Sequence, residues 1–232
     1  MIDSAIRVSS VSDWDAFKSQ NYPKSDVYLM DCIEGMKSYP DEYFDLAVVD
    51  PPYGIGENWK KDKNSKFYKH RSTYKNNSIP GPKYFKELFR VSKNQIVWGA
   101  NYYTEYLKPR NSWIVWDKNK DYETQHMAEG ELAWTSFNIP LRIISMIWNG
   151  CCTIEKRYGK HPHEKPVALY DWIFEKYAKP GDKILDTHLG SGSSRIAANK
   201  AGLDFTGFEI DEDYFNDSEE RFKNFISQAR LF

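Results

Sequence analysis

Residues Phe44–Gly56 read FDLAVVDPPYGIG, and the interpretation of the whole chain starts from this stretch. The apolar run Leu46–Val49 predicts a buried strand that ends at Asp50. The two prolines that follow have no backbone N–H to donate to a strand ladder, so the strand must stop there. A carboxylate, a stiff backbone and the ring of Tyr53 are therefore expected at the carboxyl end of a strand, where ligands bind in open α/β sheets. A rigid turn without further function is the alternative.

Outward from this stretch, strands and helices alternate along the chain. Apolar runs predict strands over residues 26–31, 44–50, 95–100, 113–116, 131–136, 141–148, 183–186 and 204–210. Helical spacing predicts helices over residues 32–39, 84–91, 167–177, 195–200 and 212–229. This alternation is typical of an α/β fold with a mostly parallel, twisted sheet and helices on both faces. The chain of 232 residues is expected to form a single domain, 1–232, with residues 1–25 as an N-terminal arm.

Composition narrows the class of protein. Hydrophobic residues make up 41% of the chain, which is ample for a globular core and argues against disorder. The N-terminus has no apolar leader and no apolar run is long enough to cross a bilayer, so a cytoplasmic protein without membrane contact is expected. The three cysteines, Cys32, Cys151 and Cys152, lack metal-ligand spacing, and neither they nor the histidines predict a metal site.

The net charge of −1 conceals a separation of charges along the chain. Residues 204–220 contain eight acids and no base, whereas residues 57–80 are rich in bases. Such a separation can orient a nucleic acid, although a solvated surface without a partner is the alternative. The long loops 54–80 and 117–130 are the candidate DNA contacts. The candidate DNA-binding side chains are Lys60, Lys61, Lys63, Lys66, Lys69, Arg71 and Lys75.

A second motif lies at Ile184–Ser194, ILDTHLGSGSS, where a predicted strand runs into a glycine turn and a helix. Gly190 and Gly192 allow a tight turn and close approach of the backbone to a ligand. Glu209 follows 17 residues after the second glycine, at the end of the next strand, where a carboxylate can accept both ribose hydroxyls. Arg195 replaces the third glycine of a dinucleotide fingerprint, which favours a nucleoside without a pyrophosphate. An ordinary α/β turn is the alternative.

Four motifs in this order resemble the S-adenosylmethionine-dependent DNA amino-methyltransferases of the permuted β group. They are Tyr28–Cys32, Asp50–Tyr53, His161–Pro166 and Asp186–Gly192, and the resemblance covers roughly residues 26–220. It implies a Rossmann-like sheet in the permuted methyltransferase topology, with the catalytic half before the cofactor half. It also implies double-stranded DNA as partner and a place in restriction–modification. Members of the group are often dimers.

The resemblance also implies roles for individual residues. Asp31 would contact the adenine amine of the cofactor, Lys165 its methionine carboxylate, and Glu209 its ribose. The methionine portion would lie against the glycine motif. The candidate cofactor-binding residues are Asp31, Cys32, Asp50, Lys165, Asp186, Gly190, Ser191, Gly192 and Glu209.

The chain departs from the family pattern at two positions. His163-Glu164 stands where Thr-Gln is usual, and Glu164 would repel a carboxylate unless it points away. Thr187-His188 stands where Pro-Phe is usual, so the aromatic packing beside the cofactor changes.

The chemistry of the proline turn can be argued without the family. An exocyclic base amine is a poor nucleophile because its lone pair is delocalised into the ring. The Asp50 carboxylate and the Pro51 carbonyl could accept its two N–H groups and favour the tetrahedral nitrogen that attacks a methyl group. Tyr53 offers a ring for stacking, and the base must first leave the duplex. The candidate catalytic residues are Asp50, Pro51, Pro52 and Tyr53.

Within the resemblance, Asp-Pro-Pro-Tyr is associated with adenine, so the resemblance implies an adenine-N6 DNA methyltransferase. Within the resemblance, Ser-Pro-Pro-Tyr is associated with cytosine N4, so a cytosine-N4 enzyme is the first alternative. A cofactor-binding partner subunit without catalysis is the second, although such subunits typically lose the acid or the aromatic residue that this chain keeps. A nicotinamide-dependent oxidoreductase would leave the proline turn unexplained.

Overall fold

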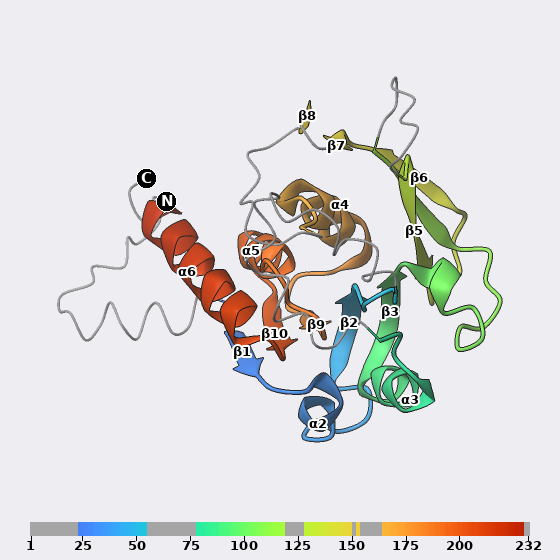
Figure 1. The fold of residues 1–232 in the computed structure, drawn as a ribbon, viewed down its shortest axis with the longest axis horizontal. Coiled ribbons are helices and arrows are strands. Elements are labelled where there is room, and N and C mark those ends of the chain that lie inside the picture. Colours follow the sequence, from blue (N-terminus) through green and yellow to red (C-terminus); the bar gives the residue numbers. More distant parts are fainter. Residues whose placement is uncertain (1–22, 55–77, 119–127, 150–151, 154–163, 230–232) are drawn as a thin grey trace, which may run out of the picture.

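The computed structural model describes residues 23–54, 78–118, 128–149, 152–153 and 164–229, which form an eight-stranded sheet with helices against it (Figure 1). The strands are β1 (Ser25–Leu29), β2 (Phe44–Val49), β3 (Ser92–Trp98), β4 (Trp113–Asp117), β5 (Gly130–Thr135), β6 (Arg142–Ser145), β9 (Lys183–Asp186) and β10 (Asp204–Glu209). The helices are α2 (Cys32–Met36), α3 (Pro82–Val91), η3 (Ala100–Tyr102), α4 (Val167–Tyr177), α5 (Ser193–Lys200) and α6 (Glu212–Ala229).

The sheet is mixed, with a parallel half and a partly antiparallel half. Its order is β1-β10-β9-β2-β3-β5-β4-β6, and the first five strands are parallel neighbours. Strand β5 runs antiparallel to both β3 and β4, whereas β6 is parallel to β4. The prediction of a mostly parallel sheet in an α/β fold is therefore confirmed.

The side chains of the central strands point alternately to the two faces of the sheet, so a separate part of the hydrophobic core lies on each face. Leu46 and Val48 of β2 belong to a buried cluster that includes α4 and α5. Ala47 and Val49, one residue out of step, belong to a second cluster that includes α2 and α3. Figure 1 shows these two pairs of helices on opposite sides of the sheet. Successive side chains of a strand point to opposite faces, so β2 had to be apolar at every position from Leu46 to Val49.

Several predicted boundaries shift, and one predicted strand is wrong as a single unit. Residues 141–148 divide into β6 and a short strand, β7 (Trp148–Asn149), which pairs with β8 (Cys152–Thr153) in a separate ladder. Between β6 and β7 the Met146 carbonyl accepts the indole N–H of Trp116 at 3.0 Å. This carbonyl is therefore bonded to a side chain at the point where the predicted strand divides. The strand predicted to reach residue 100 ends at Trp98 because Gly99 adopts a left-handed conformation, with φ +65°.

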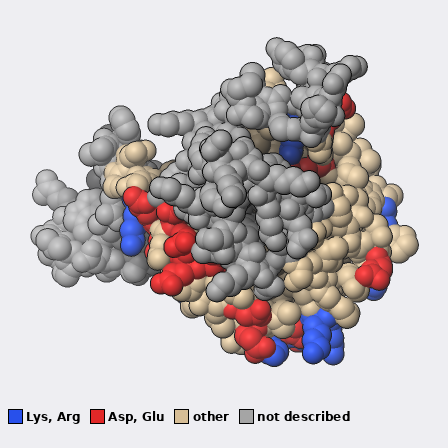
Figure 2. All heavy atoms as spheres, in the orientation of Figure 1, with Lys and Arg blue, Asp and Glu red and all other residues tan. Residues whose placement is uncertain are grey.

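The acidic segment of residues 204–220 lies largely on α6. Figure 2 shows Asp and Glu side chains gathered over this helix on the face that it draws. Glu212, Asp213 and Glu220 are exposed. The basic segment 57–80 falls almost entirely outside the described residues, so the predicted separation of charge is seen on its acidic side only.

Two further observations concern the described residues. None of their helices is both long enough and apolar enough to cross a membrane. Among these same residues, no three His, Cys, Asp or Glu side chains gather into a group that could hold a metal ion.

Candidate active site

The two motifs meet at one edge of the sheet. Strands β2 and β9 are parallel neighbours, with Leu46 opposite Ile184, so the proline turn after β2 and the glycine turn after β9 leave the sheet on the same side. Strands β10 and β1 continue this edge, with Glu209 opposite Leu29. We call the carboxyl ends of β1, β10, β9 and β2 the carboxyl edge. In order along it lie Asp31, Glu209, the glycine loop 186–192 and Asp50.

The proline turn is fixed by tyrosines from inside and outside the motif. The phenol O–H of Tyr103 lies 2.6 Å from the Pro51 carbonyl oxygen and 2.8 Å from that of Pro52. The Tyr53 hydroxyl donates to Asp50 Oδ1 at 2.5 Å. The Tyr53 ring stacks on Tyr102, with centroids 5.1 Å apart and planes 11° apart. These contacts hold the acid and the aromatic ring of the turn in one arrangement.

Gly99 is required beside this turn. A Cβ atom on this residue would lie 2.0 Å from the Tyr53 Cε1 atom, a distance that no real side chain permits. Its backbone φ of +65° also favours glycine. The end of β3 therefore approaches the Tyr53 ring more closely than any other residue type would allow.

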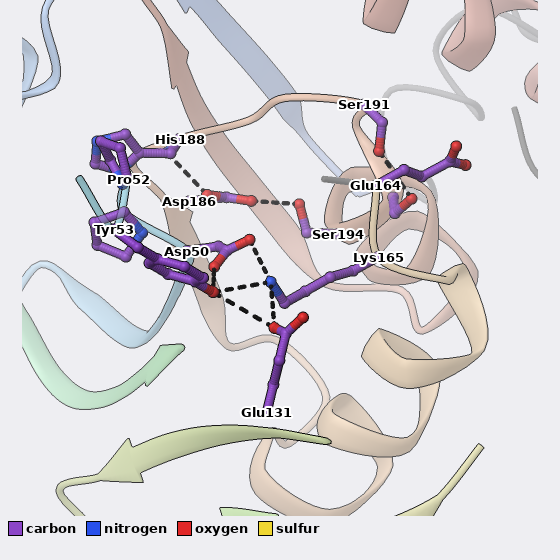
Figure 3. Close-up of polar contacts among 12 residues, drawn as sticks. Asp50, Pro52, Tyr53, Glu131, Glu164, Lys165, Asp186, His188, Ser191 and Ser194 are labelled. Atoms are coloured by element: carbon purple, nitrogen blue, oxygen red, sulfur yellow. Dashed lines mark hydrogen bonds and ion pairs between the residues drawn. The ribbon is translucent and has the colours of Figure 1, made fainter. Parts of the chain in front are cut away.

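A buried lysine contacts the other oxygen of the same carboxylate (Figure 3). Lys165 is 5% exposed and immediately precedes Pro166, the N-cap of α4. Its ammonium group bonds to Asp50 Oδ2 and lies 3.0 Å from Glu131 Oε2 and 3.3 Å from the Tyr53 hydroxyl. Glu131, on β5, also pairs through Oε1 with Lys118. Figure 3 shows Asp50, Lys165 and Glu131 pointing toward one another.

Glu131 belongs to none of the four sequence motifs. It shares the inward-facing positions of β5 with the buried Ala133, and a charged residue at such a position is the signal that could have found it. Burial alone would raise the pKa of Glu131, but Lys165 and Lys118 more than offset burial and lower it to about 2. Burial opposes the charge of Lys165, yet Asp50 and Glu131 raise its pKa. Both groups are therefore ionised at neutral pH.

The glycine loop has the conformation that its residues predict. Gly190 and Gly192 have φ of +52° and +73°, and Gly192 is the N-cap of α5. Glu209 Oε2 accepts the Gly190 N–H at 2.8 Å. Asp186 accepts the His188 N–H at 3.0 Å and the Ser194 hydroxyl at 2.5 Å, as Figure 3 shows. The loop is thus tied to the acids that flank it on β9 and β10.

Burial makes the two acids that flank this loop, Asp186 and Glu209, costly to ionise when no ligand is bound. Burial raises the pKa of Asp186 to about 7, and burial likewise raises the pKa of Glu209. A cation or a hydroxyl donor beside these groups would favour their charged forms. S-adenosylmethionine carries a sulfonium, an ammonium and two ribose hydroxyls, so the residues of the carboxyl edge fit this cofactor.

Asp31 and Cys32 lie at the far end of the carboxyl edge. The Asp31 carboxylate caps α2 by accepting the N–H groups of Ile33 and Glu34 at 2.8 and 3.2 Å through Oδ1. Burial raises the pKa of the Cys32 thiol to about 12, so this cysteine is a neutral thiol. Asp31 is therefore held in place by the helix that it begins.

The two departures from the family pattern have local explanations. Glu164 points away from Lys165 in Figure 3, and its side chain lies 3.5 Å from Arg221 of α6, so it does not face Asp50. Thr187 bonds to the buried Tyr84 hydroxyl at 2.7 Å and to His188 Nδ1 at 2.9 Å. Burial lowers the pKa of His188 to about 4, so its imidazole is neutral at physiological pH.

Ser191 is held by a residue that sequence reasoning also missed. Arg221 of α6 donates to the Ser191 carbonyl at 3.0 Å and to the Ser193 hydroxyl at 2.9 Å. It is one of two basic residues on a largely acidic helix, so the local sequence gives no signal of this contact.

Some predicted site residues cannot be placed. All seven basic candidates for DNA contact, together with His161 and His163, lie outside the described residues. Residues 119–127 of the second candidate loop, 117–130, also lie outside the described residues. Asp117 and Gly130, at the two ends of this loop, belong to β4 and β5. The proposed DNA contacts remain predictions.

Arg195 joins α5 to β1 and α6, which gives a first prediction. Its guanidinium pairs with Glu219, donates from Nε to the Ser25 hydroxyl at 2.9 Å, and lies 3.8 Å from the centroid of the Phe222 ring. Because the Arg195 side chain is buried, replacing it with alanine should lower the free energy of unfolding by about 3 kcal/mol. Urea unfolding measures this change. Lys200→Ala removes an exposed pair between the same helix and Asp171 of α4, and it should cost less than about 1 kcal/mol. Equal costs for the two variants would contradict the structural role of Arg195.

Comparison with known proteins identifies the family of this chain. The family model described as DNA methylase matches residues 68–220, more than half of the chain. The chain therefore belongs to the N6/N4 DNA methylase family. Enzymes of this family use S-adenosylmethionine, and the carboxyl edge is the candidate site for this cofactor.

Individual relatives add detail. The type II methyltransferase M2.DpnII of Streptococcus pneumoniae is 36% identical over 77 residues, which cover 32% of this chain and 29% of the relative. The match thus spans less than a third of that protein's length.

Two solved structures share the fold. The PvuII DNA methyltransferase, described as cytosine-N4-specific, has a TM-score of 0.57 at 15% identity over 87% of this chain and 88% of its own. The M1.HpyAVI complex with S-adenosylmethionine has a TM-score of 0.54 at 21% identity over 85% of this chain and 98% of its own.

Proposed function

We propose that this protein transfers a methyl group from S-adenosylmethionine to the exocyclic N6 of adenine in double-stranded DNA, after the base has been flipped out of the duplex. The observation that carries the proposal is the position of Asp50 and the Pro51 carbonyl on the edge that also holds the glycine loop. The acid at the first position of the tetrapeptide favours adenine over cytosine. The PvuII relative is described as cytosine-specific, so the fold alone does not decide the base.

Residues of the carboxyl edge would hold the cofactor, which supplies a methyl group on a cationic sulfur. Glu209 would accept the ribose hydroxyls, since its carboxylate already lies against the Gly190 N–H. Asp186 would stabilise positive charge on the methionine portion, beside Gly190 and Gly192. Asp31 would accept from the adenine amine through the oxygen that does not cap α2. Each role uses an oxygen at the end of a neighbouring strand.

The proline turn would position the target amine. Asp50 and the Pro51 carbonyl each retain acceptor capacity beyond the contacts with Lys165, Tyr53 and Tyr103, because carboxylate and carbonyl oxygens have further lone pairs. Two N–H···O bonds to these groups would favour a tetrahedral nitrogen whose lone pair is available for attack. The turn is already rigid, so little reorganisation is required when the base arrives.

Nucleoside analysis of methylated DNA tests this proposal. The protein is incubated with DNA and with cofactor labelled on the methyl group, and the DNA is then digested to nucleosides. We expect the label in N6-methyl-2′-deoxyadenosine. Label in N4-methylcytosine alone would overturn the base assignment, and label only in RNA would overturn the polymer. Cofactor binding without any transfer would favour the non-catalytic partner subunit.

The basic segment after the proline turn leads to a second prediction. Neutralising Lys60, Lys61 and Lys63 together should weaken DNA binding and reduce the slope of log affinity against log salt by up to about 3, because each phosphate contact releases about one counterion. Fluorescence anisotropy over a salt series measures both quantities. An unchanged slope would remove this segment from the DNA interface.

The raised pKa of Asp186 leads to a third prediction. Below about pH 7 this acid is mostly protonated in the free protein, whereas a bound cation favours the ionised form. The affinity for S-adenosylmethionine should therefore fall as the pH drops below about 7, by up to about tenfold per pH unit, and level off above it. Calorimetry across this range measures the effect. Asp186→Asn should remove the pH dependence, and its persistence in that variant would assign the titration to another group.

A further inference from the structure

The ammonium group of Lys165 has no N–H left for a ligand. A lysine ammonium donates three hydrogen bonds. The structure supplies three acceptors from the chain itself, namely Asp50 Oδ2, Glu131 Oε2 and the Tyr53 hydroxyl. Two of these acceptors belong to the proline turn and one belongs to strand β5, whereas none belongs to the glycine loop.

Charges alternate along this cluster. Lys118, Glu131, Lys165 and Asp50 follow one another as cation, anion, cation and anion, each in contact with the next. The Lys165 side chain is only 5% exposed, and a buried charge is tolerated when it is paired and hydrogen-bonded. Glu131 is held on one oxygen by Lys118 and on the other by Lys165, so it is a fixed anchor for the ammonium.

The contacts of Asp50 fix the orientation of its carboxylate group. Lys165 holds one carboxylate oxygen and Tyr53 holds the other, so the orientation of the carboxylate plane is set from two sides. An acceptor that must meet one N–H of a flipped base depends on that orientation. Glu131 does not contact the acid itself, so it acts on Asp50 through Lys165 and through the Tyr53 hydroxyl, which lies 3.4 Å from Glu131 Oε2.

We propose that Lys165, anchored by Glu131, is a positioning residue for the catalytic carboxylate of Asp50 and is not a ligand of the cofactor's carboxylate. The inference rests on the proposed role of Asp50 in methyl transfer. It gives the lysine before α4 a different task from the one that the family resemblance implies. It also gives a function to Glu131, a residue outside all four motifs.

Two variants separate these tasks. Glu131→Gln keeps the shape of the side chain and removes its charge, and Lys165→Met removes the ammonium. The affinity for S-adenosylhomocysteine is measured by calorimetry, and the rate of methyl transfer to DNA is measured in single turnovers at saturating cofactor. Lys176→Met, an exposed residue of α4, is the matched control and should resemble the wild type in both measurements.

We expect both variants to bind S-adenosylhomocysteine within about threefold of the wild type while their transfer rates fall by about 100-fold, the loss typical of a misplaced catalytic group. A loss of affinity of tenfold or more in folded Lys165→Met would overturn the inference, as would an unchanged transfer rate in Glu131→Gln. Thermal unfolding shows whether a variant has lost its structure. If Lys165→Met does not fold, the transfer rate of the milder variant Glu131→Gln tests the inference. If wild-type protein methylates nothing, the proposed function fails instead, and the binding measurement still assigns or removes the lysine as a cofactor ligand.

Discussion

Replacing Asp50 with alanine should lower the rate of methyl transfer by about 1,000-fold or more, because the charged acceptor for the target amine is lost. DNA affinity should change by less than about threefold, since the phosphate contacts that dominate it are expected from the basic segment 57–80. Lys165 keeps Glu131 as a countercharge in this variant, so the fold should persist. Single-turnover transfer of labelled methyl groups and anisotropy with the same duplex measure the two quantities.

The control for this experiment is another acid that lies away from the carboxyl edge. Asp171 pairs with Lys200 through side chains that are 34% and 45% exposed, and Asp171→Asn should leave both quantities unchanged. A parallel loss of transfer and DNA binding in Asp50→Ala would contradict the catalytic role, because it would make this acid part of the DNA-binding surface or of the fold.

The second large effect is expected at Glu209. Its carboxylate is the acceptor proposed for the ribose hydroxyls, and hydrogen bonds to a charged group contribute about 1.5–3 kcal/mol each. Glu209→Ala should therefore weaken S-adenosylhomocysteine binding by about 100-fold. Calorimetry or competition binding measures this change.

Glu212 provides the matched comparison for Glu209. It is exposed at the start of α6, three residues further along the chain. Glu212→Ala should bind the cofactor product like the wild type. If both variants lose affinity equally, the general negative charge of this region is responsible and the specific contact is not.

Local sequence patterns predicted the parts of the fold that depend on neighbouring residues. The apolar run before Asp50 could only be a strand buried on both faces, and two prolines ended it. The glycine loop followed from Gly190 and Gly192, whose positive φ values are those that glycine adopts readily. The meeting of the two motifs followed from a general rule, because carboxyl ends of parallel strands share one edge.

Other features depend on contacts between distant residues and have no local pattern. Glu131 is a single acid in an apolar strand, and its partner Lys165 lies 34 positions away in the chain. Arg221 supports the glycine loop from a helix that otherwise reads as a solvated acidic face. The division of residues 141–148 likewise depends on the indole of Trp116, which bonds to the Met146 carbonyl from a neighbouring strand. Such pairings arise only when tertiary packing brings the elements together.

The central claim is that Asp50 and the glycine loop serve one reaction at one edge of the sheet. A crystal structure of the protein with S-adenosylhomocysteine tests this claim most directly. The account predicts that the cofactor product contacts Glu209 and the Gly190 backbone, with its sulfur directed toward Asp50. Density for the ligand away from the carboxyl edge, or a sulfur that points away from the proline turn, would contradict it.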